Sequence, residues 1–298
     1  MSTDQAPERY SRRTLETSNG PLTVGEWAGD GPPVVAIHGV SSTHLLWLWT
    51  AKASPNLHLI APDLRGRGGS VSASGSYGLE QHADDVLTVM DAFGIDRAVV
   101  VGMSMGGFVA TGLAQKASDR MAHLLLVDGG PPMTPPTPGP KEEGLNDRLE
   151  RTVRTFADVE EYKALFRAGV GALLDPDDPV LTEYLGYDLV GDAPHLSVRL
   201  APVAVRQDAG DVFVTAPIED WMAELTIPTT LLYAEWSIGP GSTAAYPEEV
   251  VDSWRSRLPN LQARQVPGVD HAASTMSDRG AAEIARELTR ITTEVGAS

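Results

Sequence analysis

Short apolar runs alternate along the chain with longer segments in which apolar residues recur at helical spacing. Residues 34–37 are apolar throughout, whereas Leu79, Ala83 and Val86 share one helical face of segment 79–93. Such alternation is typical of a mostly parallel β-sheet flanked by helices, so we expect an α/β fold. The expected strands cover residues 22–27, 34–37, 57–61, 98–101, 123–127, 230–234 and 261–266, and the expected helices cover 79–93, 108–117, a segment from 217, 250–257 and 280–295.

The alternation breaks after residue 130. Six prolines fall between residues 131 and 140, and so many prolines are compatible with neither a helix nor an interior strand, so this stretch is expected to be a stiff connector. Helical apolar spacing without clear strands follows over residues 145–156 and 162–170. We therefore expect residues 1–130 and 215–298 to form a core domain and residues 131–214 an inserted helical cap.

Composition narrows the possible partners. The 298 residues include 23 basic and 40 acidic side chains, and the net charge of −17 repels the phosphates of nucleic acids and anionic membrane surfaces. We therefore expect neither nucleic acid nor a membrane as a partner. The chain has no cysteine, which excludes disulfides and thiolate chemistry. The first twenty residues lack the apolar stretch of a secretory signal, so we expect a cytoplasmic protein; nothing in the sequence indicates its oligomeric state.

The strongest chemical signal is the segment Gly102-Met103-Ser104-Met105-Gly106, which lies between an apolar strand and a helix. A sharp strand-to-helix turn holds such a serine in a strained backbone conformation, and glycines fit where neighbouring strands leave no room for side chains. The turn presents the hydroxyl at the carboxyl end of the sheet, where ligands of open α/β sheets bind. The sequence therefore predicts Ser104 as a nucleophile.

A serine hydroxyl needs a base and an oxyanion hole. Of the seven histidines, His271 follows the last expected strand and precedes the terminal helix, which is where the base lies in this arrangement. The oxyanion donors expected are the N–H groups of Met105, directly after the nucleophile, and of Val40, in the loop after strand 34–37. No short pair of histidines suits a metal, so we expect no metal ion and no cofactor.

These segments, in their order along the chain, resemble the α/β-hydrolase superfamily. They are His38-Gly39, Asp63-Leu64-Arg65-Gly66-Arg67-Gly68-Gly69-Ser70, Gly102 to Gly107, and His271. The resemblance extends from about residue 22 to residue 295, apart from the cap. It implies a mostly parallel central sheet flanked by helices, an inserted helical cap, and serine esterase or lactonase activity.

The third member of the expected triad departs from the family pattern. The family usually places an aspartate just after the strand that follows the cap, but Ser237 and Ile238 occupy that place. Two carboxylates remain as candidates: Glu235, and Asp128, which follows the strand after the nucleophile helix, 24 residues beyond Ser104. Because some members of the superfamily place their acid at about this distance, the resemblance favours Asp128, with Glu235 as the alternative.

The expected reaction is acyl transfer to water, in which Ser104 attacks the carbonyl of a small to medium apolar ester or lactone. Trp47 and Trp236 lie on loops near the expected site and are candidate substrate contacts. Two alternatives remain open on the same residues. One is a carbon–carbon bond hydrolase or cofactor-free perhydrolase. The other is a hydrolase-like protein that binds a small molecule as a receptor with slow or no turnover.

Overall fold

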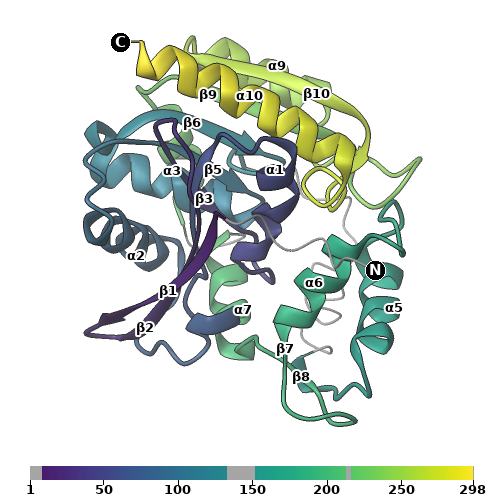
Figure 1. The fold of residues 1–298 in the computed structure, drawn as a ribbon. Coiled ribbons are helices and arrows are strands. Elements are labelled where there is room, and N and C mark those ends of the chain that lie inside the picture. The colour runs from purple at the N-terminus through teal and green to yellow at the C-terminus, as the bar shows by residue number, and fades with distance from the viewer. Residues whose placement is uncertain (1–8, 133–151, 213–215, 298) are drawn as a thin grey trace.

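The fold is built around one eight-stranded sheet in the computed structural model, which describes residues 9–132, 152–212 and 216–297 (Figure 1). Its spatial order is β1-β2-β4-β3-β5-β6-β9-β10. The strands are β1 (Tyr10–Thr17), β2 (Gly20–Trp27), β3 (Pro33–Ile37), β4 (His58–Pro62), β5 (Ala98–Met103), β6 (Met121–Val127), β9 (Thr229–Trp236) and β10 (Leu261–Asp270). The chain is an α/β protein, as its sequence predicts.

The six strands β4, β3, β5, β6, β9 and β10 are parallel, and β1 and β2 form an antiparallel hairpin that joins the sheet through β4. Strands β5 and β6 lie in the middle of the sheet, and every residue in them is buried. This burial explains why both read as continuous apolar runs, because helices cover both faces of a parallel sheet. Because the six strands are parallel, their carboxyl ends all lie at one edge of the sheet, where a site can form.

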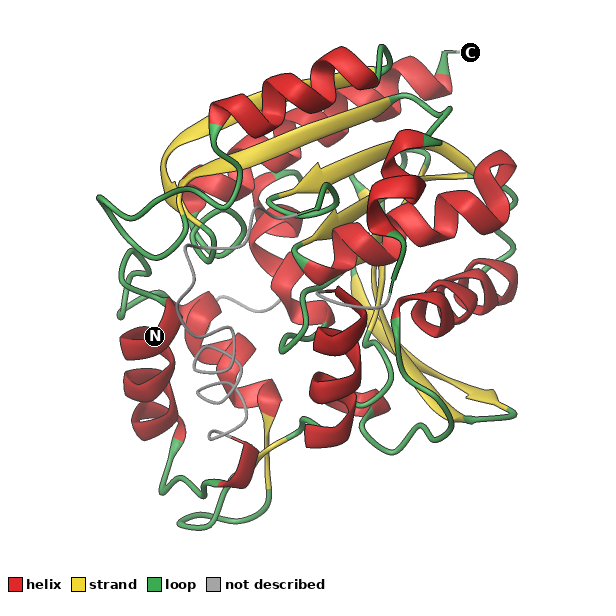
Figure 2. Ribbon diagram, turned by 180° about the vertical axis from the view of Figure 1, so that it is seen from behind, coloured by secondary structure: helices red, strands yellow, loops and turns green. Residues whose placement is uncertain are grey.

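Alternate residues of each strand supply two separate cores. Val34 and Ala36 of β3 face a core that includes α1 (Leu48–Ala53) and α10 (Asp278–Gly296), whereas Val35 and Ile37 face the opposite core. The second core is formed with α2 (Leu79–Ala92), α3 (Met105–Ala117), α8 (Ile218–Ala223) and α9 (Glu248–Arg257). Figure 2 shows these helices on both sides of the strands.

Between β6 and α8 the described chain adds no strand to the main sheet. It forms α5 (Val159–Val170), α6 (Pro179–Asp188), the short pair β7 (Leu189–Val190) and β8 (Ser197–Val198), and α7 (Pro202–Gly210). Helices α5 and α6 pack side by side (Figure 1), with the rings of Phe166 and Tyr184 6.2 Å apart between centroids. Most of the predicted proline connector and the helical pattern of residues 145–150 lie outside the described residues, and the division into core and cap domains stays a prediction.

The structure differs from the sequence-based expectation at several elements, and three of these differences have a clear physical reason. Strand β1 was not predicted, because most of its residues are polar or charged and partly exposed. Helix α3 begins at Met105, three residues before the expected start, because the nucleophile turn leads directly into it. Strand β10 continues to Asp270, beyond the expected end at residue 266, through an irregularity in its pairing with β9 that includes Pro267 and Gly268.

Candidate active site

Ser104 occupies a strained turn between β5 and α3. Its φ of 54° and ψ of −121° are rare for a residue with a side chain, and such strain costs about 1 to 3 kcal/mol. The flanking glycines allow the turn, because a Cβ on Gly102 would lie 2.2 Å from the carbonyl oxygen of Gly106. A Cβ on Gly106 would lie 2.1 Å from the carbonyl oxygen of Ile37. The sequence motif therefore has the strand-turn-helix setting that it needs, and the serine hydroxyl lies at the carboxyl edge of the sheet.

The structure brings the three predicted triad residues into one hydrogen-bonded row. His271 Nε2 lies 3.1 Å from Ser104 Oγ, and His271 Nδ1 lies 2.6 Å from Asp128 Oδ2. Asp128 has no exposed surface, whereas the His271 side chain is 28% exposed. Since a carboxylate accepts the Nδ1–H, the other ring nitrogen is left to accept the serine proton. The arrangement suits a serine nucleophile with a histidine base.

Asp128 is fixed by the backbone of the neighbouring strand. Its own N–H donates to the carbonyl of Leu232, and its Oδ1 accepts the N–H of Ala234 at 3.0 Å. Both partners belong to β9, which pairs with β6 in the register Val127 to Leu232. Asp128 also adopts a positive φ of 44°, which points to a required backbone geometry. One carboxylate oxygen thus binds β9 while the other binds His271.

The competing carboxylates lie elsewhere. Glu235 accepts the backbone N–H of Gly268 at 2.7 Å, on the side of β9 that faces β10. Asp270 accepts the N–H groups of Gly239 and Ala273, and so joins the loop after β9 to the loop that follows β10. Neither carboxylate is hydrogen-bonded to the imidazole. Of the two candidate acids from the sequence, the structure brings only Asp128 to the histidine.

The two predicted oxyanion donors flank the nucleophile. The N–H of Met105 lies at the first turn of α3, where helical N–H groups have no partner within the helix. Val40 follows Gly39, whose missing Cβ would lie 3.4 Å from Ser104 Cβ, so this loop passes close to the serine. Within the described part of the chain, neither N–H donates to another protein group. Both donors remain available for an oxyanion.

His38 holds the peptide that carries the Val40 N–H. Its Nε2 accepts the N–H of Leu64 at 3.0 Å, and its Nδ1 donates to the Gly39 carbonyl at 2.7 Å. Burial lowers the pKa of His38 to about 3, so the ring is neutral at ordinary pH and keeps this one tautomer. Because the Gly39 carbonyl and the Val40 N–H belong to one peptide plane, the hydrogen bond from His38 orients the predicted donor.

The two predicted substrate contacts have different environments. Trp236 ends β9 opposite Asp270, the residue that precedes His271, and is partly exposed. Trp47 has no exposed surface and belongs to the hydrophobic core on the α1 and α10 side. A substrate could touch Trp47 only if its neighbours moved. Substrate contact by Trp236 stays a prediction, and the location of this residue favours it. Substrate contact by Trp47 also stays a prediction, but the burial of its side chain argues against it.

The sequence did not indicate how α6 meets the active-site loops. Tyr184 donates to Ser42 Oγ at 2.9 Å, two residues beyond Val40, and Tyr187 donates to Asp63 Oδ2 at 2.6 Å. Nothing in the spacing of these tyrosines distinguishes them from residues that only fill a core. The contact between Tyr184 and Ser42 shows that α6 lies against the loop that carries the predicted oxyanion donor.

The fold, the strained serine turn and the hydrogen-bonded row of Ser104, His271 and Asp128 are typical of alpha/beta hydrolases. Residues 32–274 match the alpha/beta hydrolase fold family, and the chain belongs to this family. Similarity to a 2-(acetamidomethylene)succinate hydrolase of Mesorhizobium japonicum extends over nearly the whole chain. The two are 25% identical over 279 residues, which cover 93% of this chain and 94% of that enzyme. The crystal structure of E-2-(acetamidomethylene)succinate hydrolase superposes with a TM-score of 0.78 at 20% identity, covering 95% of this chain and 98% of that one.

Other curated relatives match over shorter spans. Lipase LipV of Mycobacterium tuberculosis is 31% identical over 174 residues, which cover 57% of this chain and 62% of the lipase. An uncharacterized protein of the same organism is 30% identical over 128 residues, or 43% of this chain and 37% of its own length. The match therefore spans little more than a third of that relative. Among the described residues, no helix is long and apolar enough to span a membrane.

Proposed function

We propose that this protein is a serine hydrolase that cleaves a carboxylic ester or lactone of a small to medium apolar substrate through an acyl-enzyme on Ser104. The observation that carries the proposal is the row Ser104 Oγ, His271 Nε2, His271 Nδ1 and Asp128 Oδ2, with distances of 3.1 Å and 2.6 Å. This row suits removal of the serine proton. The lipase among the relatives supports an ester as the first substrate class to examine.

The proposed reaction begins when His271 takes the Ser104 proton as the hydroxyl attacks the substrate carbonyl. The N–H groups of Val40 and Met105 stabilise the tetrahedral oxyanion, and Asp128 stabilises the imidazolium that forms. His271 then protonates the leaving oxygen, which leaves an acyl group on Ser104. Water, activated by His271, attacks this ester and releases the acid, and the proton returns to Ser104.

A substituted amide is a second candidate substrate. The full-length relative is named for hydrolysis of an acetamidomethylene compound, and the same serine row can attack an amide carbonyl. An amide differs from an ester in its leaving group, because the departing nitrogen must be protonated by the histidine. The two classes are therefore separated by comparing matched substrates that share an acyl group and differ only in oxygen or nitrogen at the scissile bond.

The first test is hydrolysis of p-nitrophenyl acetate and butyrate and of the matched p-nitroanilides, together with a lactone series. Wild type and Ser104→Ala are compared, each confirmed folded by circular dichroism and thermal melting. Intact-protein mass spectrometry after rapid quenching would detect the added acyl mass on wild type and not on Ser104→Ala. Equal rates for the two proteins on every substrate would overturn the serine mechanism.

Further assays on the same two proteins separate the remaining alternatives. A perhydrolase would convert acetate and hydrogen peroxide to peracetate in a Ser104-dependent reaction, and a carbon–carbon hydrolase would cleave a β-diketone while leaving the esters untouched. A receptor-like protein would show thermal stabilisation by a ligand without steady turnover.

A further inference from the structure

A buried ion pair connects α7 to the loop that carries the Val40 donor. Arg67 Nη2 lies 2.5 Å from Asp208 Oδ2, and neither side chain has any exposed surface. The same guanidinium donates from Nε to the Val40 carbonyl at 2.9 Å and from Nη1 to the Arg65 carbonyl at 2.9 Å. Arg67 therefore lies between Asp208, from the segment between β6 and α8, and the backbone of the predicted oxyanion loop.

Asp208 is itself held in place by two hydrogen bonds, one from a residue of α2 and one from the residue that precedes α2. Its Oδ1 accepts the Gly78 N–H at 2.7 Å, and its Oδ2 lies 3.0 Å from His82 Nε2. Burial alone would raise the pKa of Asp208, but the charges of His82 and Arg67 lower it to about 2. The carboxylate is thus ionised throughout the working pH range of most proteins and keeps its hold on the guanidinium.

The Arg67 backbone is bound to the same segment. Arg67 forms an antiparallel bridge with Leu200, the Gly68 N–H donates to the Arg199 carbonyl at 2.9 Å, and the Ala201 N–H donates to the Gly66 carbonyl at 2.8 Å. The start of α7 is therefore fixed to the Arg67 loop both by backbone hydrogen bonds and by the ion pair. Movement of this segment would displace the guanidinium.

The Val40 donor depends on such support. It follows a glycine, and Gly39 restricts its own backbone less than any other residue would. His38 fixes the carbonyl on one side of Val40, and Arg67 fixes the carbonyl on the other side. The Val40 N–H shares its peptide plane with the Gly39 carbonyl, and the next peptide plane carries the Val40 carbonyl. Because both planes are held, rotation about the Val40 backbone is restricted and the N–H keeps one direction, which an oxyanion hole requires before the reaction begins.

We propose that Arg67 and Asp208 are positioning residues for the oxyanion hole, through which the α7 segment sets the direction of the Val40 N–H. The inference rests on the proposed function, because it concerns the same acyl transfer. Neither residue touches the reacting atoms. Their effect is on the charge that develops in the transition state, so kcat is the parameter that they change.

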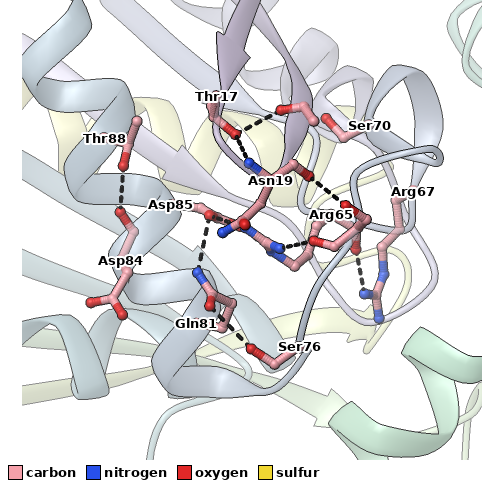
Figure 3. Close-up of polar contacts among 12 residues, drawn as sticks. Thr17, Asn19, Arg65, Arg67, Ser70, Ser76, Gln81, Asp84, Asp85 and Thr88 are labelled. Atoms are coloured by element: carbon pink, nitrogen blue, oxygen red, sulfur yellow. Dashed lines mark hydrogen bonds and ion pairs between the residues drawn. The ribbon is translucent and has the colours of Figure 1, made fainter.

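A second buried pair in the same loop supplies a matched control. Arg65 forms two hydrogen bonds with Asp85, at 2.6 Å and 2.5 Å, and its side chain is almost completely buried. Figure 3 shows this pair, with the Arg67 side chain directed away from it. Arg65 resembles Arg67 in burial, charge and position, but its side chain makes no hydrogen bond to the oxyanion loop. The variants to compare are Arg67→Lys with Arg65→Lys, and Asp208→Asn with Asp85→Asn.

Arg67→Lys keeps a cation for Asp208 but loses the Nε–H that binds Val40. We expect its kcat for the best ester to fall about 10- to 100-fold, short of the loss for a whole oxyanion donor, with KM changed less than about threefold. The inhibition constant of phenylboronic acid, whose tetrahedral adduct on Ser104 mimics the oxyanion, should rise in parallel. The low-pH limb of the kcat/KM profile should not move.

Asp208→Asn should show the same pattern, whereas Arg65→Lys and Asp85→Asn should keep kcat within about threefold while lowering the melting temperature. Equal kcat losses in both pairs, or a loss carried by KM alone, would overturn the inference and leave the serine mechanism intact.

Hydrogen exchange of the peptide covering residues 38–43 gives a readout that needs no turnover. Exchange should be faster in Arg67→Lys than in Arg65→Lys, and equal exchange would count against the positioning role. If wild type has no Ser104-dependent activity, the proposed function fails, and this measurement still decides whether Arg67 orders the loop.

Discussion

Replacing Asp128 by asparagine is the most informative change in the triad, because the surroundings fix how the amide must lie. The Ala234 N–H donates to Oδ1 of the present carboxylate, so the amide oxygen must take that place. The amide nitrogen then faces His271 Nδ1 at the position where Oδ2 now accepts a hydrogen bond at 2.6 Å. Two donors cannot share that contact, so the imidazole must carry its proton on Nε2 instead.

A histidine with its proton on Nε2 cannot accept the proton of Ser104. We therefore expect Asp128→Asn to lower kcat by about 10⁴-fold, as the corresponding change does in a serine protease, which is about 5.5 kcal/mol of activation free energy. The melting temperature should change little, because the substitution conserves shape and removes a buried charge. The assay is p-nitrophenyl butyrate hydrolysis under saturating and limiting substrate.

Glu235→Gln is the control for this prediction. Glu235 accepts the Gly268 N–H, and a glutamine oxygen can keep that bond, so activity should stay within about twofold. The reasoning is refuted if Asp128→Asn retains more than about one tenth of the wild-type kcat, or if Glu235→Gln loses as much as Asp128→Asn does.

Three further changes test the packing around the site and the buried ionisable groups. Gly129→Ala should cost about 3 kcal/mol or more and lower the melting temperature sharply, because its Cβ would lie 2.2 Å from the Ser104 carbonyl oxygen; normal melting would show that the strand-turn geometry is wrong. Tyr187→Phe should cost about 1 to 3 kcal/mol in urea unfolding, because buried Asp63 loses a donor at 2.6 Å; an unchanged midpoint would contradict this. Burial, with a smaller effect of a nearby arginine charge, lowers the pKa of His123 to about 4, so the unfolded chain binds its proton first as the pH falls. The free energy of unfolding should therefore fall by up to roughly 3 kcal/mol between pH 6.5 and pH 4, and His123→Gln should remove this part of the pH dependence, measured by urea unfolding at each pH.

Much of the sheet could be predicted because its strands are buried on both faces. Strands β5 and β6 consist largely of apolar residues, and such runs between helical patterns leave little ambiguity. Strand β1 could not be predicted because it lies at the sheet edge and pairs with β2 alone. Its charged residues face solvent, so its sequence lacks the apolar run of a buried strand. The extension of β10 could not be predicted either, since Pro267 and Gly268 ordinarily indicate a turn and here lie in an irregular stretch of a strand.

In the candidate site, too, features that depend on neighbouring residues could be predicted from the sequence, whereas contacts between distant residues could not. The position of Ser104 in a tight strand-to-helix turn could be predicted because its glycines are needed within a few residues, and the structure shows the backbone contacts that exclude larger side chains. The contact between Arg67 and Asp208 joins residues far apart in sequence. Arg67 lies in a segment that carries the family resemblance, but no local pattern indicates that Asp208 is its partner. Buried ion pairs of this kind depend on how the helices between β6 and α8 lie against the core, which periodicity does not determine.

The position of the acid shows why the family pattern alone left two candidates. Strands β6 and β9 are parallel neighbours that end at the same edge, so residues after either strand can approach one histidine. In this chain the carboxylate follows β6, and its second oxygen binds the Ala234 N–H, so that β9 positions the acid without supplying it. Ile238, one of the two residues in the place after β9 where the family usually has an aspartate, is 66% exposed. The same histidine can therefore be oriented from either strand, and the choice is decided by which strand end provides a buried carboxylate with a backbone donor beside it.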